Sequence, residues 1–179
     1  MISRPGRHNG GRTAGRQKNC NAMITLSTPA EVAASAFSAA EYIPEEAITE
    51  ADIAAAERHS IIPVTGRALY ERLAAGGYPT LCEEFVKPAL AASVRVAVQP
   101  LLAVRCGACG IVTPRSDSIE PADAKQRGEV MRALRRRASE LLRRLSEELE
   151  RSAAAYPEYD SRDNILNRCT IYGDIVQTH

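Results

Sequence analysis

The chain has 179 residues, of which 45% are hydrophobic and 25% are charged, and its formal net charge is +1. This length suits one domain with tails, and the lack of any run of about 18 apolar residues argues against a membrane span. Five cysteines without a secretion signal argue against a disulfide framework. Abundant Ala, Leu, Glu and Arg, with no Trp, predict an all-α fold, a small helical bundle.

The first 22 residues, MISRPGRHNGGRTAGRQKNCNA, form a basic segment without an apolar run. They hold five basic residues and no acidic one, so the other 18 basic residues face 22 acidic ones and the rest of the chain carries about −4. We predict that residues 1–22 are disordered. They are either upstream sequence ahead of a natural start at Met23, which we favour, or an arm that binds nucleic acid.

Two helix starts carry clear capping signals. In STPAEVAASAF, Thr28 can cap the helix and Glu31 completes a capping box. Thr49 is placed to cap a second helix, EADIAAAERHSII, whose first turn is acidic and therefore suits the positive end of the helix dipole. Both signals predict short helices in the first third of the fold.

A helix–turn–helix unit is predicted over residues 50–75. Pro63 should interrupt the first helix, so that IIPVTG is not one clean helix, because proline lacks the amide donor and clashes with the preceding turn. Gly66 then allows a tight turn into the helix RALYERLAAGG, which Gly76 and Gly77 end.

A central helix is predicted in YPTLCEEFVKPALAASVRVAVQPLLAVRCG. Pro88 and Pro100 should kink it. The stretch between them is nearly all apolar, so this helix should be the most buried. Gly107 should end it, one residue after Cys106.

The longest helix is predicted from Pro121 to Pro157, with a length of roughly 50 Å. Its apolar side chains recur at helical spacing and form one stripe, namely Val130, Leu134, Ala138, Leu141, Leu145 and Leu149. The opposite face of this helix is rich in Arg and Glu, which suits solvent or an interface.

The last 24 residues are too irregular for a helix and form a predicted C-terminal arm. The stretch CTIYGDIV has β-branched residues around a glycine, which predicts a short strand or hairpin. The predicted organisation is therefore a basic segment at 1–22, a helical domain at 23–155 and an arm at 156–179.

Cys106 and Cys109 have the spacing of zinc sites and dithiol enzymes. A structural zinc site needs a second ligand pair, which the sequence does not offer, and a redox pair needs a helix start, whereas these residues lie at a predicted helix end. We keep them as weak metal candidates and expect no metal and no cofactor.

The sequence contains none of the usual catalytic constellations, and His59 is the only histidine inside the predicted fold. We therefore expect no enzyme. The unit at 50–75, together with the basic segment, is compatible with a small helical DNA-binding regulator. That alternative is disfavoured, because the second helix offers only Arg67 and Arg72 as basic residues for reading DNA.

Three stretches, SIIPVTGRALYERL (60–73), GYPTLCEEFVKPALAASVRVAV (77–98) and YPEYDSRDNILNRC (156–169), stand in a recognisable order. In this order the chain resembles the small helical head–tail connector, or neck adaptor, proteins of tailed bacteriophages and prophages. The openings TPAEVAASAF and ITEADIAAAERH fit the same pattern, which extends from Met23 to the end. Residues 1–22 and the cysteine pair lie outside it.

The resemblance implies a structural virion protein without catalysis. Such adaptors assemble as a homo-oligomeric ring, commonly twelve-fold, below the portal protein and next to a tail or stopper protein. DNA passes through the channel without sequence-specific binding. The implied localisation is the virion neck, with assembly in the host cytoplasm and no membrane.

A heterologous ring contact needs two different patches on each subunit. The candidate patches are the Arg-rich helix 130–151 and the acidic helix starts near 45–52, with termini that clasp neighbours. The candidate interface residues are Arg132, Arg135, Arg136, Arg143, Arg144, Glu45, Glu46, Glu50, Tyr156, Tyr159 and Tyr172.

Overall fold

The computed structural model describes residues 25–38, 41, 43–102, 105–107, 110–112, 122–168, 170–172 and 175–177. For Glu45 and for the residues of the four strands it describes the backbone alone. The predicted basic segment at 1–22 lies outside this range. The helical elements are α1 Pro29–Ala36, η1 Glu45–Ala47, α2 Glu50–Ala56, η2 Glu57–Ile61, α3 Ile62–Thr65, α4 Arg67–Ala74, α5 Pro79–Leu81, η3 Cys82–Val86, α6 Lys87–Leu102, α7 Ala124–Arg151, η4 Ala153–Ala155 and η5 Ile165–Asn167. The strands are β1 Arg105–Gly107, β2 Gly110–Val112, β3 Thr170–Tyr172 and β4 Ile175–Gln177.

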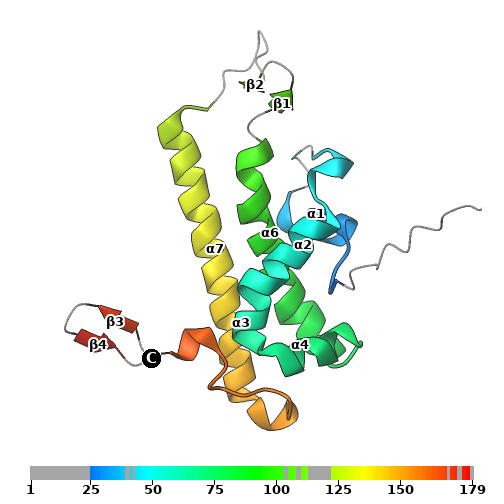
Figure 1. Ribbon diagram of the computed structural model, residues 1–179, viewed down its shortest axis with the longest axis vertical. Coiled ribbons are helices and arrows are strands. Elements are labelled where there is room, and N and C mark those ends of the chain that lie inside the picture. The colour runs from blue at the N-terminus through cyan, green and yellow to red at the C-terminus, as the bar shows by residue number, and fades with distance from the viewer. Residues whose placement is uncertain are drawn as a thin grey trace, which may run out of the picture.

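The predicted all-α bundle is confirmed. The helices α6 and α7 run side by side along the length of the molecule, α1 and α2 pack against α6, and α3 packs against α7 and α4 (Figure 1). Two short antiparallel hairpins, β1–β2 and β3–β4, are attached to this bundle. The β3–β4 hairpin is the one predicted in CTIYGDIV.

The predicted helix starts of α1 and α2 are confirmed by their hydrogen bonds. The amide of Glu31 donates to the Thr28 hydroxyl at 3.3 Å, and the amide of Thr28 donates to the Glu31 carboxylate at 2.9 Å. At α2 the Asp52 carboxylate accepts from both the amide and the hydroxyl of Thr49, at 2.9 and 2.7 Å. Reciprocal capping satisfies amides that the first helical turn leaves without partners.

The predicted interruption at Pro63 takes the form of a π-turn, since the chain stays helical through to Thr65 but Glu57–Ile61 is not regular α-helix. The elements η2 and η3 are π-turns, and each ends two residues before a proline, Pro63 or Pro88. In each case the last amide before the proline donates to a carbonyl five residues back, and this shift absorbs the break in the hydrogen-bond ladder. Gly66, with φ of 74°, makes the predicted tight turn.

The central helix is continuous from Pro79 to Leu102 and forms the centre of the core, as predicted. It ends at Leu102 rather than at Gly107, since Pro100 removes an amide from its last turn and β1 begins at Arg105. By length and composition this 24-residue helix also meets the criteria for a membrane span, as core helices of soluble proteins do. Its buried side chains face α1, α2 and α7.

The long helix α7 has 28 residues and is therefore about 42 Å long, shorter than predicted. It begins after Asp123, whose carboxylate accepts from the amide of Gln126 at 2.7 Å, and it ends before Ser152. The predicted apolar stripe is buried at its lower end, where Leu145 and Leu149 are fully enclosed. At the upper end Val130 is 48% exposed.

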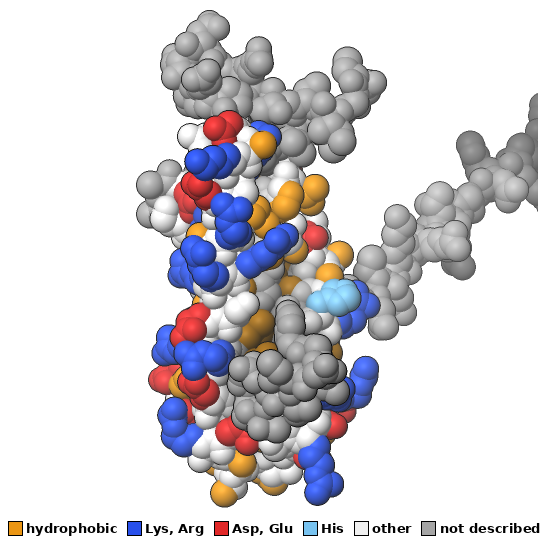
Figure 2. All heavy atoms as spheres, turned by 90° about the vertical axis from the view of Figure 1, so that its left-hand side faces the viewer, with side chains coloured by type: hydrophobic (Ala, Val, Ile, Leu, Met, Phe, Trp, Pro, Cys, Tyr) orange, Lys and Arg blue, Asp and Glu red, His pale blue; other side chains and the backbone are white. Residues whose placement is uncertain are grey.

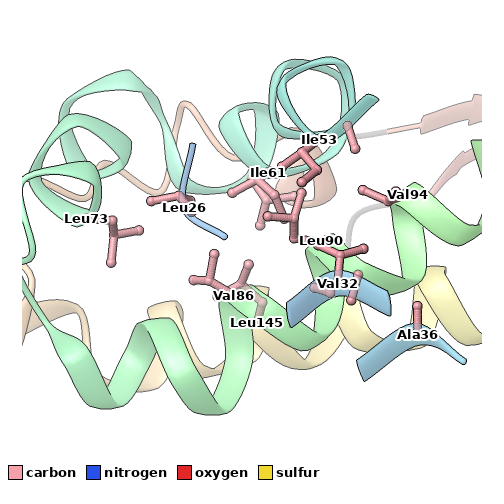
Figure 3. Close-up of a cluster of buried hydrophobic side chains, with 14 of the residues drawn as sticks. Leu26, Val32, Ala36, Ile53, Ile61, Leu73, Val86, Leu90, Val94 and Leu145 are labelled. Atoms are coloured by element: carbon pink, nitrogen blue, oxygen red, sulfur yellow. The ribbon is translucent and has the colours of Figure 1, made fainter. Parts of the chain in front are cut away.

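The core collects side chains from nearly every helix (Figure 3). Leu90 and Val94 of α6 meet Val32 of α1, Ile53 of α2 and Leu145 of α7. Each of these five side chains is at most 1% exposed. The lower part of the bundle therefore has a closed core of its own.

Candidate interaction surfaces

The arginines predicted as interface candidates are all exposed on α7. Figure 2, which looks onto this side of the molecule, shows Lys and Arg side chains along the helix. In residues 124–137, six side chains are basic and only Glu129 is acidic. The six basic residues are Lys125, Arg127, Arg132, Arg135, Arg136 and Arg137.

This charge arrangement is unfavourable within the subunit. The first turn of a helix carries the positive end of the dipole and favours acidic side chains, whereas the first turn of α7 holds Lys125 and no acidic residue. Arg132 and Arg136 are four residues apart, a spacing at which like charges repel. Local helix stability therefore does not explain the basic half of α7, and a negatively charged partner surface would.

The carboxy-terminal half of α7 has the opposite character, because two of its three arginines, Arg143 and Arg151, have carboxylate partners in the same helix. Arg143 donates to Glu140 at 2.7 Å and also contacts Glu147. Arg151 pairs with Glu148 at 2.8 Å. The hydrogen bond from Arg143 lowers the pKa of Glu140. These pairs are solvated, so they contribute little to stability, yet they leave this half close to neutral.

The acidic candidates at the start of α2 have mostly local roles. Glu46 and Glu50 are exposed, and Glu50 occupies the first turn of α2, where the dipole favours it. The side chain of Glu45 lies outside the described residues. The surface is thus acidic at this end, as predicted, with Glu46 and Glu50 free to face a neighbour.

The tyrosine candidates lie in different environments. Tyr156 is half-buried and packs edge-to-face against Tyr78, with ring centroids 5.0 Å apart. Tyr159 belongs to the subunit's own core, with 9% exposure, and its hydroxyl donates to Glu150 at 2.5 Å. Burial, together with this bond, raises the pKa of Tyr159 to about 12. The side chain of Tyr172 lies outside the described residues.

A buried asparagine, which sequence reasoning missed, fixes the segment after α7. Asn164 has no exposed surface. Its side-chain amide donates to the hydroxyls of Ser146 and Tyr159, both at 2.8 Å, and its carbonyl accepts from the amide of Leu166 at 3.0 Å. Every polar atom of this buried side chain is thus used, which locks the backbone that enters η5.

A buried glutamate, also missed, fixes the other end of the described chain. Glu57 is only 2% exposed, at the start of the π-turn η2. Its carboxylate accepts from the amide of Leu26 at 2.6 Å and from the hydroxyl of Tyr70 at 2.8 Å. Burial and the bond to Glu57 raise the pKa of Tyr70. No spacing in the sequence distinguishes Glu57 from the surface acids around it.

Four large apolar side chains are exposed among the described residues, and they form two groups. Leu101 of α6 and Val130 of α7 lie in the upper parts of the two long helices, with exposures of 63% and 48%. Ile165 and Leu166 are adjacent in η5, with exposures of 51% and 40%. Scattered exposed leucines need no explanation, but two neighbours on a locked turn form a small apolar patch.

A shallow groove runs along α6 between α1 and α7. Its upper part is a cavity of about 80 Å³ under Ser35, Arg137 and Leu141. Its lower part is an open depression of about 390 Å³ between Ala34 of α1 and Lys87 at the start of α6. The floor is formed mainly by the small side chains Pro88, Ala91 and Ala92.

Of the cysteine pair, Cys106 does not lie at a helix end, contrary to the prediction. Cys106 is in strand β1, opposite Ile111 of β2, while Cys109 lies outside the described residues. Within the described part of the chain, no three His, Cys, Asp or Glu side chains are grouped to hold a metal ion. Cys82 is half-buried, and burial raises the pKa of its thiol, which disfavours the reactive thiolate.

The second helix of the predicted DNA-reading unit is occupied by the chain's own contacts. Leu69 and Leu73 of α4 are buried, and Tyr70 is bonded to Glu57. Arg72 lies 3.7 Å from the carboxylate of Glu158 in the segment after α7. Arg67 is exposed, which leaves α4 little basic surface to offer a DNA groove.

Comparison with known proteins gives one match. The family model described as "Family of unknown function (DUF6712)" matches residues 45–168, which covers the part of the chain from η1 to η5. No curated protein and no solved structure matches the chain.

Proposed function

The chain belongs to the family of unknown function DUF6712, and we propose that it is a structural subunit of a head–tail connector ring in a tailed phage or prophage. In this proposal the copies assemble below a portal protein, in the virion neck, and a tail or stopper protein binds the other side. DNA passes through the ring without sequence-specific contacts, and the subunit carries no catalytic activity.

The observation that carries the proposal is the unpartnered upper half of α7. This half contacts α6 on one side and projects beyond the helices that close the base of the bundle (Figure 1). It combines six basic side chains with one acidic one and lies beside the exposed Leu101. Exposed arginines around apolar side chains are typical of protein interfaces.

The acidic start of α2 offers a second, different patch of opposite charge. Glu46 and Glu50 are exposed there, and the basic residues of α7 lie on another element. Two unlike patches on one subunit support head-to-tail contacts, which close into a ring when the rotation between neighbours permits it.

The native mass of the full chain over a concentration series tests the proposal. We expect a closed oligomer of ring size, in a single species that salt weakens because opposite charges are screened. The same measurement on residues 23–179 separates the contribution of the basic segment.

A monomer that also fails to assemble on a purified portal ring would overturn the proposal. A two-fold dimer that binds duplex DNA with strong salt dependence would favour the DNA-binding regulator instead. Duplex binding no stronger than that of an equally charged control protein would exclude the regulator.

A further inference from the structure

The turn η5 presents two apolar side chains to solvent on a rigid support. Ile165 and Leu166 follow directly after Asn164, whose amide is satisfied on both sides by buried partners. Asn167, the next residue, donates to Ser161 at 3.0 Å and to Glu150. The backbone is thus fixed on both sides of the exposed pair, which we call the apolar knob.

A rigid exposed knob indicates a partner surface. Ordering a turn costs conformational entropy. Two large apolar side chains that stay exposed contribute no burial free energy to offset this cost. An anchor held in its binding conformation reduces the entropy lost on association. The structure therefore favours a docking role for the knob over an incidental exposure.

The groove between α1, α6 and α7 has features that complement the knob. Its floor is apolar and made of small side chains, so it is shallow enough for two branched residues to reach. The guanidinium of Arg137 borders its upper end, and the exposed Asp160 and Asp163 stand in the turn just before the knob. Charge is complementary at this upper end, whereas the lower part of the groove is lined by Glu31, Glu83 and Lys87, where Lys87 pairs with both glutamates, and Arg162 lies between the two aspartates.

The knob and the groove lie on opposite flanks of the same subunit. Arg137 lines the groove, while Ser146 binds the asparagine that supports the knob. These two α7 residues are nine positions apart, which is about two and a half helical turns and places them on opposite sides of α7. In Figure 1 the segment before the C-terminal hairpin lies to the left of lower α7, whereas α1 lies to the right of α6.

We infer that the knob of one copy docks in the groove of a second copy. This inference rests on the proposed ring, which needs a head-to-tail contact between unlike patches on opposite flanks. The contact would place Ile165 and Leu166 over the Ala91–Ala92 floor, with Asp160 and Asp163 toward Arg137 of the neighbour.

Site-specific photo-crosslinking tests the contact directly. The full chain, with p-benzoylphenylalanine in place of Ile165, is mixed with an isotopically labelled unmodified chain and irradiated. We expect intermolecular crosslinks to residues 34–36 and 88–92, identified by mass spectrometry. Crosslinks confined to the same chain, or to another surface of the second copy, would overturn the inference.

Two variants with matched controls test how much the knob–groove contact contributes to self-association. Leu166→Ser and Ala34→Gln change exposed positions of the knob and of the groove wall, so both chains should fold normally. We expect each to weaken self-association at least about tenfold, by analytical ultracentrifugation. Ala68→Gln repeats the groove substitution at an exposed position of α4, outside both surfaces, and Leu166→Met keeps the knob apolar, so both should leave self-association nearly unchanged. Equal effects of variants and controls would count against the inference.

The outcomes separate this inference from the proposed function. A ring that assembles without knob–groove crosslinks overturns the inference and leaves the connector proposal standing. Knob–groove crosslinks in an open filament support the inference and count against the ring. The absence of both self-association and crosslinks overturns the contact, and the portal assay then decides the function.

Discussion

The base of the molecule and its upper helix pair differ in how far their polar and apolar side chains find partners within the chain. The base comprises α2 to α4, the lower half of α7 and residues 156–168, and its polar groups are satisfied internally, as Asn164 and Glu57 show. The upper helix pair, residues 95–102 and 124–137, has two helices beside each other with exposed apolar residues, and its α7 half carries basic side chains that form no ion pair within the helix. The base is closed within one chain, whereas the upper pair is the region that the connector proposal assigns to contacts with a neighbouring copy.

If the connector proposal is correct, one end of the continuous helix α7 serves folding and the other end serves assembly. The same apolar stripe of α7 stabilises the fold at Leu145 and is half open to solvent at Val130. The arginines follow a similar division, since Arg143 and Arg151 of the lower half pair with glutamates, whereas no arginine of the upper half forms an ion pair within the helix. Substitutions in the two halves should therefore affect different measurements.

The largest effect should come from the closed end of the stripe. Leu145→Ala removes a fully buried side chain and should lower the free energy of unfolding by about 2–5 kcal/mol. Val130→Ala, at the open end, should change it by less than about 0.5 kcal/mol. Urea denaturation of both variants measures this contrast. Similar losses at both positions would show that the upper pair is as much a part of the folding core as the base.

A smaller effect should come from the buried asparagine. Asn164→Ala leaves the Ser146 and Tyr159 hydroxyls without one partner each and should cost about 1–3 kcal/mol. Asn167→Ala removes bonds that are more exposed and should cost less. Thermal unfolding compares the two. An Asn164 variant as stable as the wild type would mean that residues 156–168 are loosely attached, and the apolar knob would lose its rigid support.

Local signals predicted much of the fold because they act within a few residues. Thr28 and Thr49 cap their helices as expected, since a capping box depends only on residues three positions apart. The apolar run between Pro88 and Pro100 predicted the central helix for the same reason. The proline rule predicts an interruption at Pro63 but not its form, because a π-turn whose position no local rule specifies keeps the chain helical.

The candidate surfaces were only partly predictable. The sequence shows the positive charge of the α7 arginines. It does not show which of them form an ion pair, because this depends on which glutamates lie on the same helix face. Glu57 and Asn164 read as ordinary polar residues, because their burial results from contacts 31 and 18 residues away in the chain. The knob and the groove combine elements far apart in sequence, so neither leaves a pattern in it.

The dependence of stability on pH should show how much the Glu31 carboxylate, at the start of α1, contributes to the free energy of unfolding. Hydrogen bonds from Thr28 and Ser27, with Lys87 nearby, lower the pKa of Glu31 from 4.5 to about 2. Since the folded pKa is depressed, this stabilisation is complete above about pH 4.5 and is lost as pH falls toward 2.

Glu31→Gln should therefore reduce stability near neutral pH, and the difference from the wild type should vanish near pH 2. We expect less than about 1 kcal/mol, because the carboxylate is half exposed and solvent screens it. Thermal unfolding from pH 2 to pH 7 measures the difference. A gap that stays constant across this range would assign the loss to packing and not to the charge.

The smallest effect on folding should come from the basic half of α7. Replacement of Arg132, Arg135 and Arg136 by alanine removes like charges spaced three and four residues apart and introduces a better helix former. The melting temperature should therefore change by no more than about 2 °C or rise slightly. Arg143→Ala, which breaks pairs with Glu140 and Glu147, is the matched control and should lower it. If the triple variant keeps its fold but loses salt-sensitive self-association, the arginines serve assembly alone. If it loses stability instead, the upper half of α7 has a partner within its own subunit, and the division between base and upper pair does not hold.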